Sequence, residues 1–431
     1  MSALNRLSFA LTESGPPLPQ EEVKAEATTS RQWVAEAKRI GDQLLGNALR
    51  AKDGAPVWLK HGSPFDSDGK PVPLGPHLYN GACGVSLFLA ALASEDGDEE
   101  VRAAALASLV PLRQRLAALV ADPARAESTA LRIGGVIGLG AFLYVFTRIG
   151  QWLEEPVLLR EACDIGGLLT AERIASDGSL DVMYGSAGAL LGLLALEKAV
   201  PRELSGPARL LERATACANH LLEQRISTAG GAKAWPYKGG PPLPSFAHGA
   251  SGIAAALARL AERTGDDSLR AAALEGLRFE RERFAPEQQN WRSTEAHDET
   301  LMTAWCNGAP GVALGRLEAM AAGPLPFELQ TELEIALATT KNAPPAKSDF
   351  LCCGNMGRAD ILLESSRVLG RDDLLQAARG IAAEVVVRAA GDWFGPAEKG
   401  RNAAFFRGVS GIGYSLLRHS GSRLPNVLTL E

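Results

Sequence analysis

The sequence lacks the features that mark most nucleic-acid-binding, membrane-spanning and disulfide-rich proteins. Its 431 residues carry a net charge of -6, and no run is rich in Lys or Arg, so nucleic acid is not an expected partner. No apolar stretch approaches the roughly 20 residues that cross a bilayer, so no membrane span is expected. Only 6 cysteines occur, too few for a disulfide scaffold in so long a chain.

The N-terminus shows no secretory signal either. The opening MSALNRLSFALTESGPP has no charged start followed by a long apolar run and a small-residue cleavage site. We therefore expect a cytoplasmic protein, whose thiols stay reduced. Clustered cysteines in that compartment are better interpreted as metal ligands or nucleophiles, and the adjacent pair Cys352 and Cys353 needs such an explanation.

A repeated glycine motif organises most of the chain. Residues 1–32 are rich in Pro, Ser, Thr and charge and are predicted to be a flexible tail, with one domain over 33–431. Within that domain a Gly-x-x-Gly pair, followed at once by small and aliphatic residues, recurs about every 45 to 65 residues. A period of this size is typical of repeat architecture. The pairs begin at Gly81, Gly135, Gly185, Gly249, Gly308, Gly354 and Gly408.

The segments after the glycine pairs predict an all-α fold. Stretches such as VSLFLAALA and ALLGLLALE are apolar on nearly all sides and should form buried helices. Amphipathic stretches such as ARLLERATACANHLLEQR lie between them. An inner ring of buried helices inside an outer ring, an α/α toroid, satisfies both patterns. Glycine lets each chain turn approach its neighbours closely, and all the turns should fall at one end of the toroid.

Two of these turns carry cysteines. Cys306 stands two residues before Gly308, and Cys352 and Cys353 directly precede Gly354. Because consecutive repeats are neighbours in a ring, the three thiols could meet at its mouth. Three thiolates at one point suit a zinc ion, whose fourth position would stay open as in catalytic zinc sites. Buried free cysteines are often only small hydrophobes, and that interpretation applies to Cys83, Cys163 and Cys217.

Two further polar residues stand at equivalent turns. His248, in SFAHGASG, should face the same mouth, although a single His at a helix start is often only a packing residue. Asp181 precedes its glycine pair by four residues and could equally be a helix cap or a solvated loop acid.

The motifs HGASG, WCNGAPG and CCG, in this order, resemble the lanthionine synthetase C-like cyclases, and in particular the C-terminal cyclase domain of class II lanthipeptide synthetases. The resemblance runs from about Gly41 to FFRGVSGIGYSLLR. It implies an α/α toroid of seven inner and seven outer helices and one zinc ion held by Cys306, Cys352 and Cys353. It further implies catalytic roles for His248 and Asp181, and it gives as substrate a dehydrated precursor peptide, with a dehydratase domain or protein as a possible partner.

The chain departs from this family pattern in three respects. The pair before Gly354 is Cys-Cys where Cys-His is commoner, which matches a three-thiolate subgroup and implies a more electron-rich metal. Asn307 stands where relatives usually carry His or Tyr. Met302 stands roughly where freestanding cyclases carry Arg. No Arg or Tyr role is therefore transferred to these positions.

The expected chemistry is addition of a peptide thiol to a dehydroalanine or dehydrobutyrine. A zinc-bound substrate thiol would be deprotonated at neutral pH and could attack the β-carbon. His248 would either accept the thiol's proton or protonate the resulting enolate, with Asp181 orienting it. The sequence does not decide between these two steps.

Other functions remain open on the residues alone. A non-catalytic zinc-binding toroid that binds peptides or proteins would keep the metal but would need neither His248 nor Asp181. A glycosidase requires two facing carboxylates, whereas the glycine turns supply only Asp181. A prenyltransferase-like enzyme also activates thiols on zinc, but the Cys-Cys turn and the glycine repeats fit it poorly.

Overall fold

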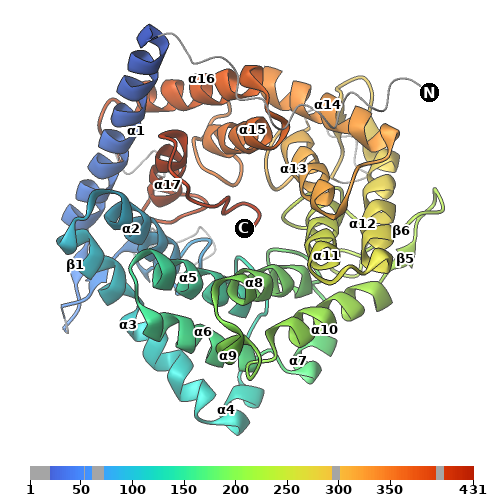
Figure 1. The fold of residues 1–431 in the computed structure, drawn as a ribbon, viewed down its shortest axis with the longest axis horizontal. Coiled ribbons are helices and arrows are strands. Elements are labelled where there is room, and N and C mark those ends of the chain that lie inside the picture. The colour runs from blue at the N-terminus through green and yellow to red at the C-terminus, as the bar shows by residue number, and fades with distance from the viewer. Residues whose placement is uncertain (1–19, 53, 61–71, 294–300, 395–401) are drawn as a thin grey trace.

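The computed structural model describes residues 20–52, 54–60, 72–293, 301–394 and 402–431, which form a closed double ring of helices (Figure 1). The inner ring of the described chain consists of α2 (Ala82–Asp96), α5 (Leu139–Trp152), α8 (Ser186–Ala199), α11 (Ala250–Thr264), α13 (Ala309–Ala319), α15 (Asn355–Leu369) and α17 (Val409–His419). The outer ring consists of α1 (Gln20–Gly46), α3 (Glu99–Val120), α6 (Pro156–Gly167), α10 (Leu210–Glu223), α12 (Asp267–Phe279), α14 (Phe327–Asn342) and α16 (Asp372–Ala389). The predicted all-α toroid is confirmed.

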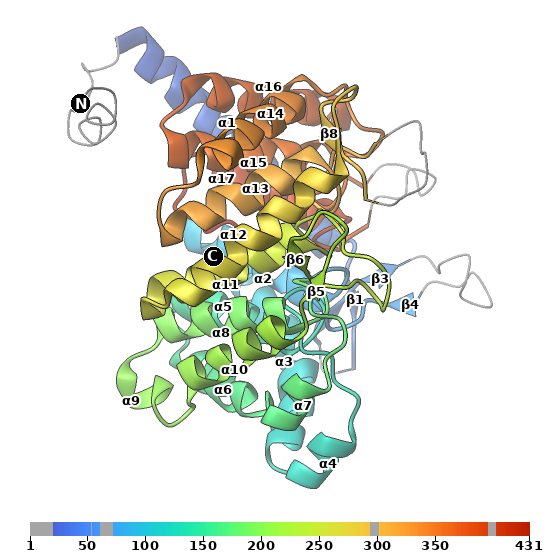
Figure 2. The ribbon, with the colours of Figure 1, turned by 90° about the vertical axis from the view of Figure 1, so that its right-hand side faces the viewer.

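The remaining described elements are short. Helices α4 (Pro123–Ser128), α7 (Ala171–Ala175) and α9 (Arg202–Ser205) and the 3-10 turns η1 (Glu280–Arg283) and η2 (Met320–Ala322) lie between the long helices. Four antiparallel hairpins pair β1 (Leu49–Arg50) with β2 (Pro56–Val57), β3 (Leu59–Lys60) with β4 (Val72–Pro73), β5 (Ile226–Ser227) with β6 (Lys233–Ala234), and β7 (Phe284–Ala285) with β8 (Asn290–Trp291). Figure 2 shows these strands gathered at one end of the ring.

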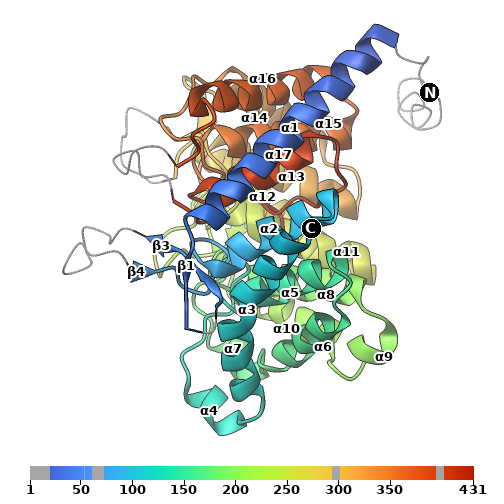
Figure 3. The same cartoon turned by 90° about the vertical axis from the view of Figure 1, so that its left-hand side faces the viewer.

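Each inner helix packs along the outer helix that follows it in the chain, and α17 packs along α1 to close the ring. Figure 3 shows α1 lying across α17, so the two ends of the sequence meet in one helix pair. Inner helices such as α2 and α8 are apolar on nearly all sides because both their faces are covered; α8 buries a continuous run from Ser186 to Leu193. The core is therefore the space between the two rings.

Helix α1 begins inside the segment that was expected to be a tail. The flexible tail was expected to reach residue 32, but α1 begins at Gln20, so residues 20–32 are helical. Glu, Ala, Lys and Arg, which favour helices, outweigh the Thr-Thr-Ser stretch that suggested a tail. Residues 1–19 lie outside the described residues.

Helix α3 is both long and apolar. Of the described helices, it alone has the length and apolarity of a membrane-crossing segment, a test that core helices also pass. It packs along α2 in the outer ring and buries Leu109 and Leu116.

The glycine pairs stand where the chain enters the inner helices. The first glycine caps the helix, and a Cβ on the second would lie only 1.9 to 2.4 Å from the carbonyl oxygen six residues earlier. Only glycine fits such a close backbone approach. This holds for Gly84, Gly188, Gly252, Gly311, Gly357 and Gly411.

The second copy, GVIG, is shifted from this pattern. Helix α5 is capped by Gly138, the second glycine of the predicted pair, so the position equivalent to the other second glycines is Ala141. Gly135 instead packs against the backbone of Gly188 in the next turn. The prediction of seven equivalent pairs is thus correct for six of them.

A belt of backbone hydrogen bonds joins the turns at one end of the ring. In five of the seven turns the residue two positions before the capping glycine donates its N–H to the same position of a neighbouring turn, over N···O distances of 2.9 to 3.4 Å. The donors and acceptors run Cys352 to Phe406, Phe406 to Tyr79, Tyr79 to Val136, Val136 to Met183, and Met183 to Ala247. The prediction that the turns share one end of the toroid is confirmed.

Candidate functional site

Four of the five residues predicted for the site stand in the turns at this end of the ring. His248 directly precedes its capping glycine Gly249, while Cys306, Cys352 and Cys353 occupy one of the two positions before theirs. The fifth, Asp181, lies two residues before Met183 of the belt. The fold therefore brings all five to one end of the ring, although they are spread over more than 170 residues of sequence.

Asp181 and His248 form a hydrogen-bonded pair between neighbouring turns. The Nδ1 atom of His248 lies 2.8 Å from Oδ2 of Asp181, whose side chain is only 2% exposed. The other carboxylate oxygen, Oδ1, accepts a hydrogen bond of 2.6 Å from the backbone N–H of Tyr184. Burial raises the pKa of Asp181, while the hydrogen bond to His248 lowers it. The carboxylate is thus fixed on one side and orients the imidazole on the other.

Two tyrosine rings flank His248. The ring of Tyr184 stacks on the imidazole with centroids 5.7 Å apart, and the ring of Tyr237 is tilted against it at 5.4 Å. A cation lies over each tyrosine: Arg132 at 4.8 Å from the centroid of Tyr184, and Lys238 at 5.0 Å from that of Tyr237. The imidazole therefore sits between aromatic walls with positive charge outside them.

The three thiols influence one another's pKa, with Cys352 between the other two. Cys352 has the largest effect on the pKa of Cys306 and on that of Cys353. The interaction with Cys352 lowers the pKa of Cys306, whereas the same contact raises the pKa of Cys352 to about 12. The pKa of Cys353 is raised chiefly by its contact with Cys352. Ionising one thiol thus disfavours ionising its neighbours unless a cation is added.

The donor chemistry of these thiols fits zinc. Cys306 and Cys352 are buried and Cys353 is half-buried, so a metal here would be shielded but reachable. Within the described residues, no three His, Cys, Asp or Glu side chains converge closely enough to count as a finished metal site. The thiols would have to draw closer together around an ion.

A phenol supports the central thiol. The hydroxyl of Tyr79 donates a hydrogen bond of 3.1 Å to Sγ of Cys352, and its ring stacks on Phe406 with centroids 5.4 Å apart. Burial is the main cause of a raised pKa at Tyr79, so the hydroxyl keeps its proton. Tyr79 thus orients the thiol that contacts both of the others.

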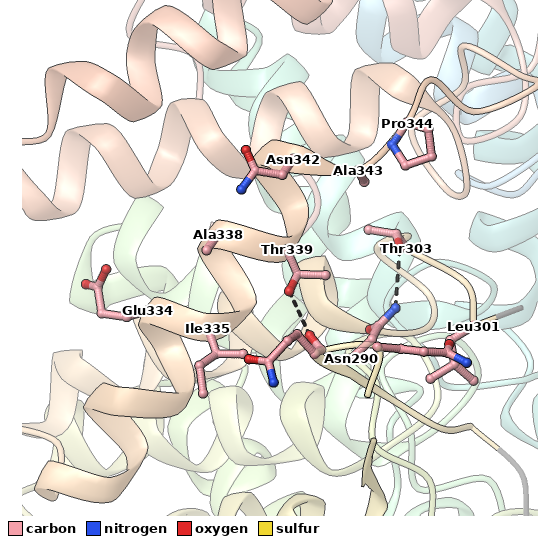
Figure 4. Close-up of a pocket in the computed structure, with 12 residues that line it drawn as sticks. Asn290, Leu301, Thr303, Glu334, Ile335, Ala338, Thr339, Asn342, Ala343 and Pro344 are labelled. Carbon is pink, nitrogen blue, oxygen red and sulfur yellow. Dashed lines mark hydrogen bonds between the residues drawn. The ribbon is translucent and has the colours of Figure 1, made fainter. Parts of the chain in front are cut away.

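The turn that carries Cys306 is held from outside the belt. The amide nitrogen of Asn290 in β8 donates to the carbonyl of Met302 at 3.2 Å, and its oxygen accepts from the backbone N–H of Ala309 at 2.8 Å. A cavity of about 730 Å³ lies behind this turn, lined by Asn290, Thr303 and the side of α14 (Figure 4). Neither the thiols nor the His248–Asp181 pair line it, so it is separate from both groups.

A second cavity adjoins the histidine. It has a volume of about 470 Å³ and is bounded by Arg132, Arg173 and Tyr184, among other polar residues. Because Tyr184 also stacks on His248, this cavity lies next to the His248–Asp181 pair.

The other cysteines are separate from the site. Cys83 and Cys217 are fully buried in helices, and Cys163 is 8% exposed in α6. Burial raises the pKa of Cys163 to about 11 and that of Cys217 to about 12. Their interpretation as small core residues agrees with this placement.

Sequence reasoning missed Tyr79, Tyr184, Tyr237 and Lys238. For two of them a signal existed. Tyr79 stands two residues before Gly81, as Cys306 does before Gly308, and Tyr184 directly precedes Gly185, as His248 does Gly249. Tyr237 and Lys238 lie in a loop outside the repeated motif, so no spacing identified them.

The double ring of helices, with its reactive side chains at the turns of one end, places the chain among the α/α-toroid proteins. The model of the family described as lanthionine synthetase C-like protein matches residues 72–429. The chain therefore belongs to the lanthionine synthetase C-like family.

A solved structure shows the same fold. A nisin cyclase superposes with a TM-score of 0.59 at 16% identity, covering 82% of this chain and 92% of that chain. An unsaturated glucuronyl hydrolase specific for heparin gives a TM-score of 0.44 at 12% identity, covering 84% of this chain and 98% of its own. No curated protein matches the sequence.

Proposed function

We propose that this chain is a zinc-dependent lanthionine cyclase, which adds cysteine thiols of a dehydrated precursor peptide to its dehydroalanine or dehydrobutyrine residues. The observation that carries the proposal is the placement of three interacting thiols on the same belt of turns as the His248–Asp181 pair. Membership of the lanthionine synthetase C-like family supports it.

Cys306, Cys352 and Cys353 would hold the metal. A zinc ion bound by these thiolates would supply a Lewis acid that keeps a substrate thiol deprotonated at neutral pH. Tyr79 would hold Cys352 in place through its hydrogen bond of 3.1 Å.

The reaction moves one proton and forms one carbon–sulfur bond. The substrate thiol loses its proton, its sulfur bonds to Cβ of the dehydro residue, and the π electrons pass to Cα and the adjoining carbonyl oxygen. Cα then takes up a proton. His248 serves one of the two proton transfers through Nε2, since Asp181 holds Nδ1 at 2.8 Å.

The reaction needs a dehydrated substrate and a reducing compartment. The substrate must already be dehydrated, so a dehydratase domain or protein acts before this one. A reducing cytoplasm would keep the six free cysteines as thiols.

The alternative is a zinc-binding toroid that binds peptides without catalysis. It shares the fold and the thiols with the cyclase, but it gives no role to the hydrogen bond between His248 and Asp181. The pair favours the cyclase, because a buried carboxylate that orients a histidine is more typical of a catalytic site than of a scaffold.

Metal content and ring formation, measured on the same proteins, test the proposal. The proteins are the wild type, Cys306→Ala, Cys353→Ala and His248→Ala, with Cys217→Ala as a control for loss of a buried thiol away from the site. Ring formation is followed by mass spectrometry of a dehydrated peptide after alkylation of its remaining thiols.

We expect about one zinc per chain in the wild type, the histidine variant and the control, and loss of zinc in the other two cysteine variants. His248→Ala should form rings about 100- to 10,000-fold more slowly. A folded wild type without zinc would refute the metal site. Zinc without ring formation would favour the scaffold.

A further inference from the structure

The loop between β6 and α11 presses an aromatic ring and a cation against the His248 side of the site. Trp235 anchors this loop: its side chain is 2% exposed, and its indole N–H donates to the carbonyl of Leu221 at 2.8 Å. Two residues later, the ring of Tyr237 contacts the imidazole of His248. The anchor therefore fixes where the next residue of the loop stands.

That next residue, Lys238, has an unusual backbone. Its φ is 49° and that of Gly239 is 74°, and the N–H of Gly240 donates to the carbonyl of Tyr237 at 2.9 Å. Two central residues with positive φ are typical of a type I′ turn, whose first such position is favoured by Asn, Asp or Gly. Lysine is not a turn former there. A side chain kept at such a position points to a use for its chemistry.

The ammonium group of Lys238 is held at the rim of the site. It lies over the ring of Tyr237, 5.0 Å from the ring centroid. This contact, and attraction to Tyr184 and Asp181, raise the pKa of Lys238, which keeps it charged. Arg132, the other cation near His248, lies over Tyr184 instead.

The proposed reaction requires such a charge. When sulfur bonds to Cβ of a dehydro residue, negative charge develops on the carbonyl oxygen of that residue until Cα is protonated. Fixed positive groups placed where charge develops contribute much of the rate in comparable reactions. His248 can move the proton, but a second group must stabilise the oxygen. Met302 and Asn307, in the turn of Cys306, are uncharged.

We propose that Lys238, braced against Tyr237, is a catalytic residue that stabilises the enolate oxygen of the acceptor residue while His248 handles the proton. This inference rests on the cyclase function proposed above. Stabilisation of the acceptor residue would thus come from a loop outside the glycine repeat.

The test compares three variants with the wild type. Lys238→Asn removes the charge while tolerating positive φ, so the turn should be kept. Lys238→Arg keeps a cation. Lys233→Asn makes the same change of charge in β6 of the same loop region and serves as the control. Each protein is checked by thermal unfolding and zinc content, and kcat and KM for ring formation are then measured on a dehydrated peptide.

We expect Lys238→Asn to lower kcat about 100-fold with KM changed less than about twofold, because the lost contact exists only in the transition state. Lys238→Arg should recover most of the rate, and Lys233→Asn should match the wild type. Ring formation by folded Lys238→Asn at the wild-type rate would overturn this inference and leave the cyclase intact. A wild type that forms no rings would overturn both.

Discussion

The carboxylate of Asp181 holds the imidazole of His248 by a hydrogen bond of 2.8 Å, although 67 residues separate them in the chain. The bond joins two neighbouring turns, which are also tied through the backbone by the N–H of Met183 and the carbonyl of Ala247 at 3.1 Å. The backbone bond sets the distance between the two turns, and this distance places the carboxylate within hydrogen-bonding reach of the imidazole. The imidazole is thereby oriented before any substrate arrives.

The first prediction concerns this pair. Asp181→Asn should lower the rate of ring formation about 100-fold or more, because the amide cannot stabilise a protonated imidazole. Asp164→Asn, at an exposed position on α6, removes an equal charge and should leave the rate unchanged. Initial rates on a dehydrated peptide measure both. Equal rates for Asp181→Asn and the wild type would show that His248 acts without its partner.

A second prediction concerns the phenol beside the thiols. Tyr79→Phe should weaken zinc binding about 10- to 100-fold, because a hydrogen bond that orients a ligand is lost while the ring still stacks on Phe406. Tyr414→Phe is the matched control, since it loses a hydroxyl bonded to the carbonyl of Pro425 at 3.0 Å. Competition with a chelator measures the affinity. Unchanged affinity in Tyr79→Phe would separate this residue from the metal.

The third prediction tests the close approach at the turns. In Gly357→Ala the new Cβ would stand 1.9 Å from the carbonyl oxygen of Leu351, so the free energy of unfolding should fall by about 3 kcal/mol or more. Gly380→Ala, on the exposed side of α16 with nothing within 4 Å, should instead raise it by about 1 kcal/mol. Denaturant unfolding gives both values. Similar effects of the two substitutions would contradict the structural role of the turn.

The fourth prediction is a pH dependence of stability at the α1–α17 contact. His419 is 2% exposed, neither ring nitrogen has a hydrogen-bond partner among the described residues, and burial lowers its pKa from 6.5 to about 4. The folded protein keeps this imidazole neutral, whereas the unfolded chain protonates it below pH 6.5. Its contribution to stability is therefore complete above that pH and is lost as the pH falls toward 4.

His419→Leu removes this titration. Between pH 6.5 and 4, the wild type should lose about 3 kcal/mol more of its free energy of unfolding than the variant does. Urea unfolding at several pH values measures the difference. Parallel pH profiles for the two proteins would mean that protonation of His419 does not oppose folding.

The repeat made the fold and half of the site predictable. Consecutive turns of a ring are neighbours, so the positions of Cys306 and Cys352 before their glycines were enough to bring them together. The same reasoning failed at GGVIGLG, where several glycines fit the spacing and the helix cap is Gly138. The helix over residues 20–32 was not predicted, because the local composition there is typical of a tail. In the structure these residues form the first part of α1.

The roles of Tyr79, Tyr184 and Lys238 could not be predicted from the sequence. Tyrosine is a common core residue, so Tyr79 and Tyr184 could not be told from packing residues without their contacts. The positive φ of Lys238 depends on the turn that Tyr237 and Gly240 close, and nothing in the composition of that loop fixes it. Tertiary contacts decided these positions.

The belt of backbone bonds is interrupted on both sides of one turn. Among the described residues, no such bond joins Cys306 to Ala247 or to Cys352; instead, Trp305 contacts Phe246 and Phe406 through its ring, at 6.2 and 5.0 Å. Ring contacts tolerate small displacements better than hydrogen bonds do. The separation between Cys306 and Cys352 is thus set by ring contacts and not by a backbone bond of the belt, so it would shorten more easily than the other spacings when an ion draws the thiols together.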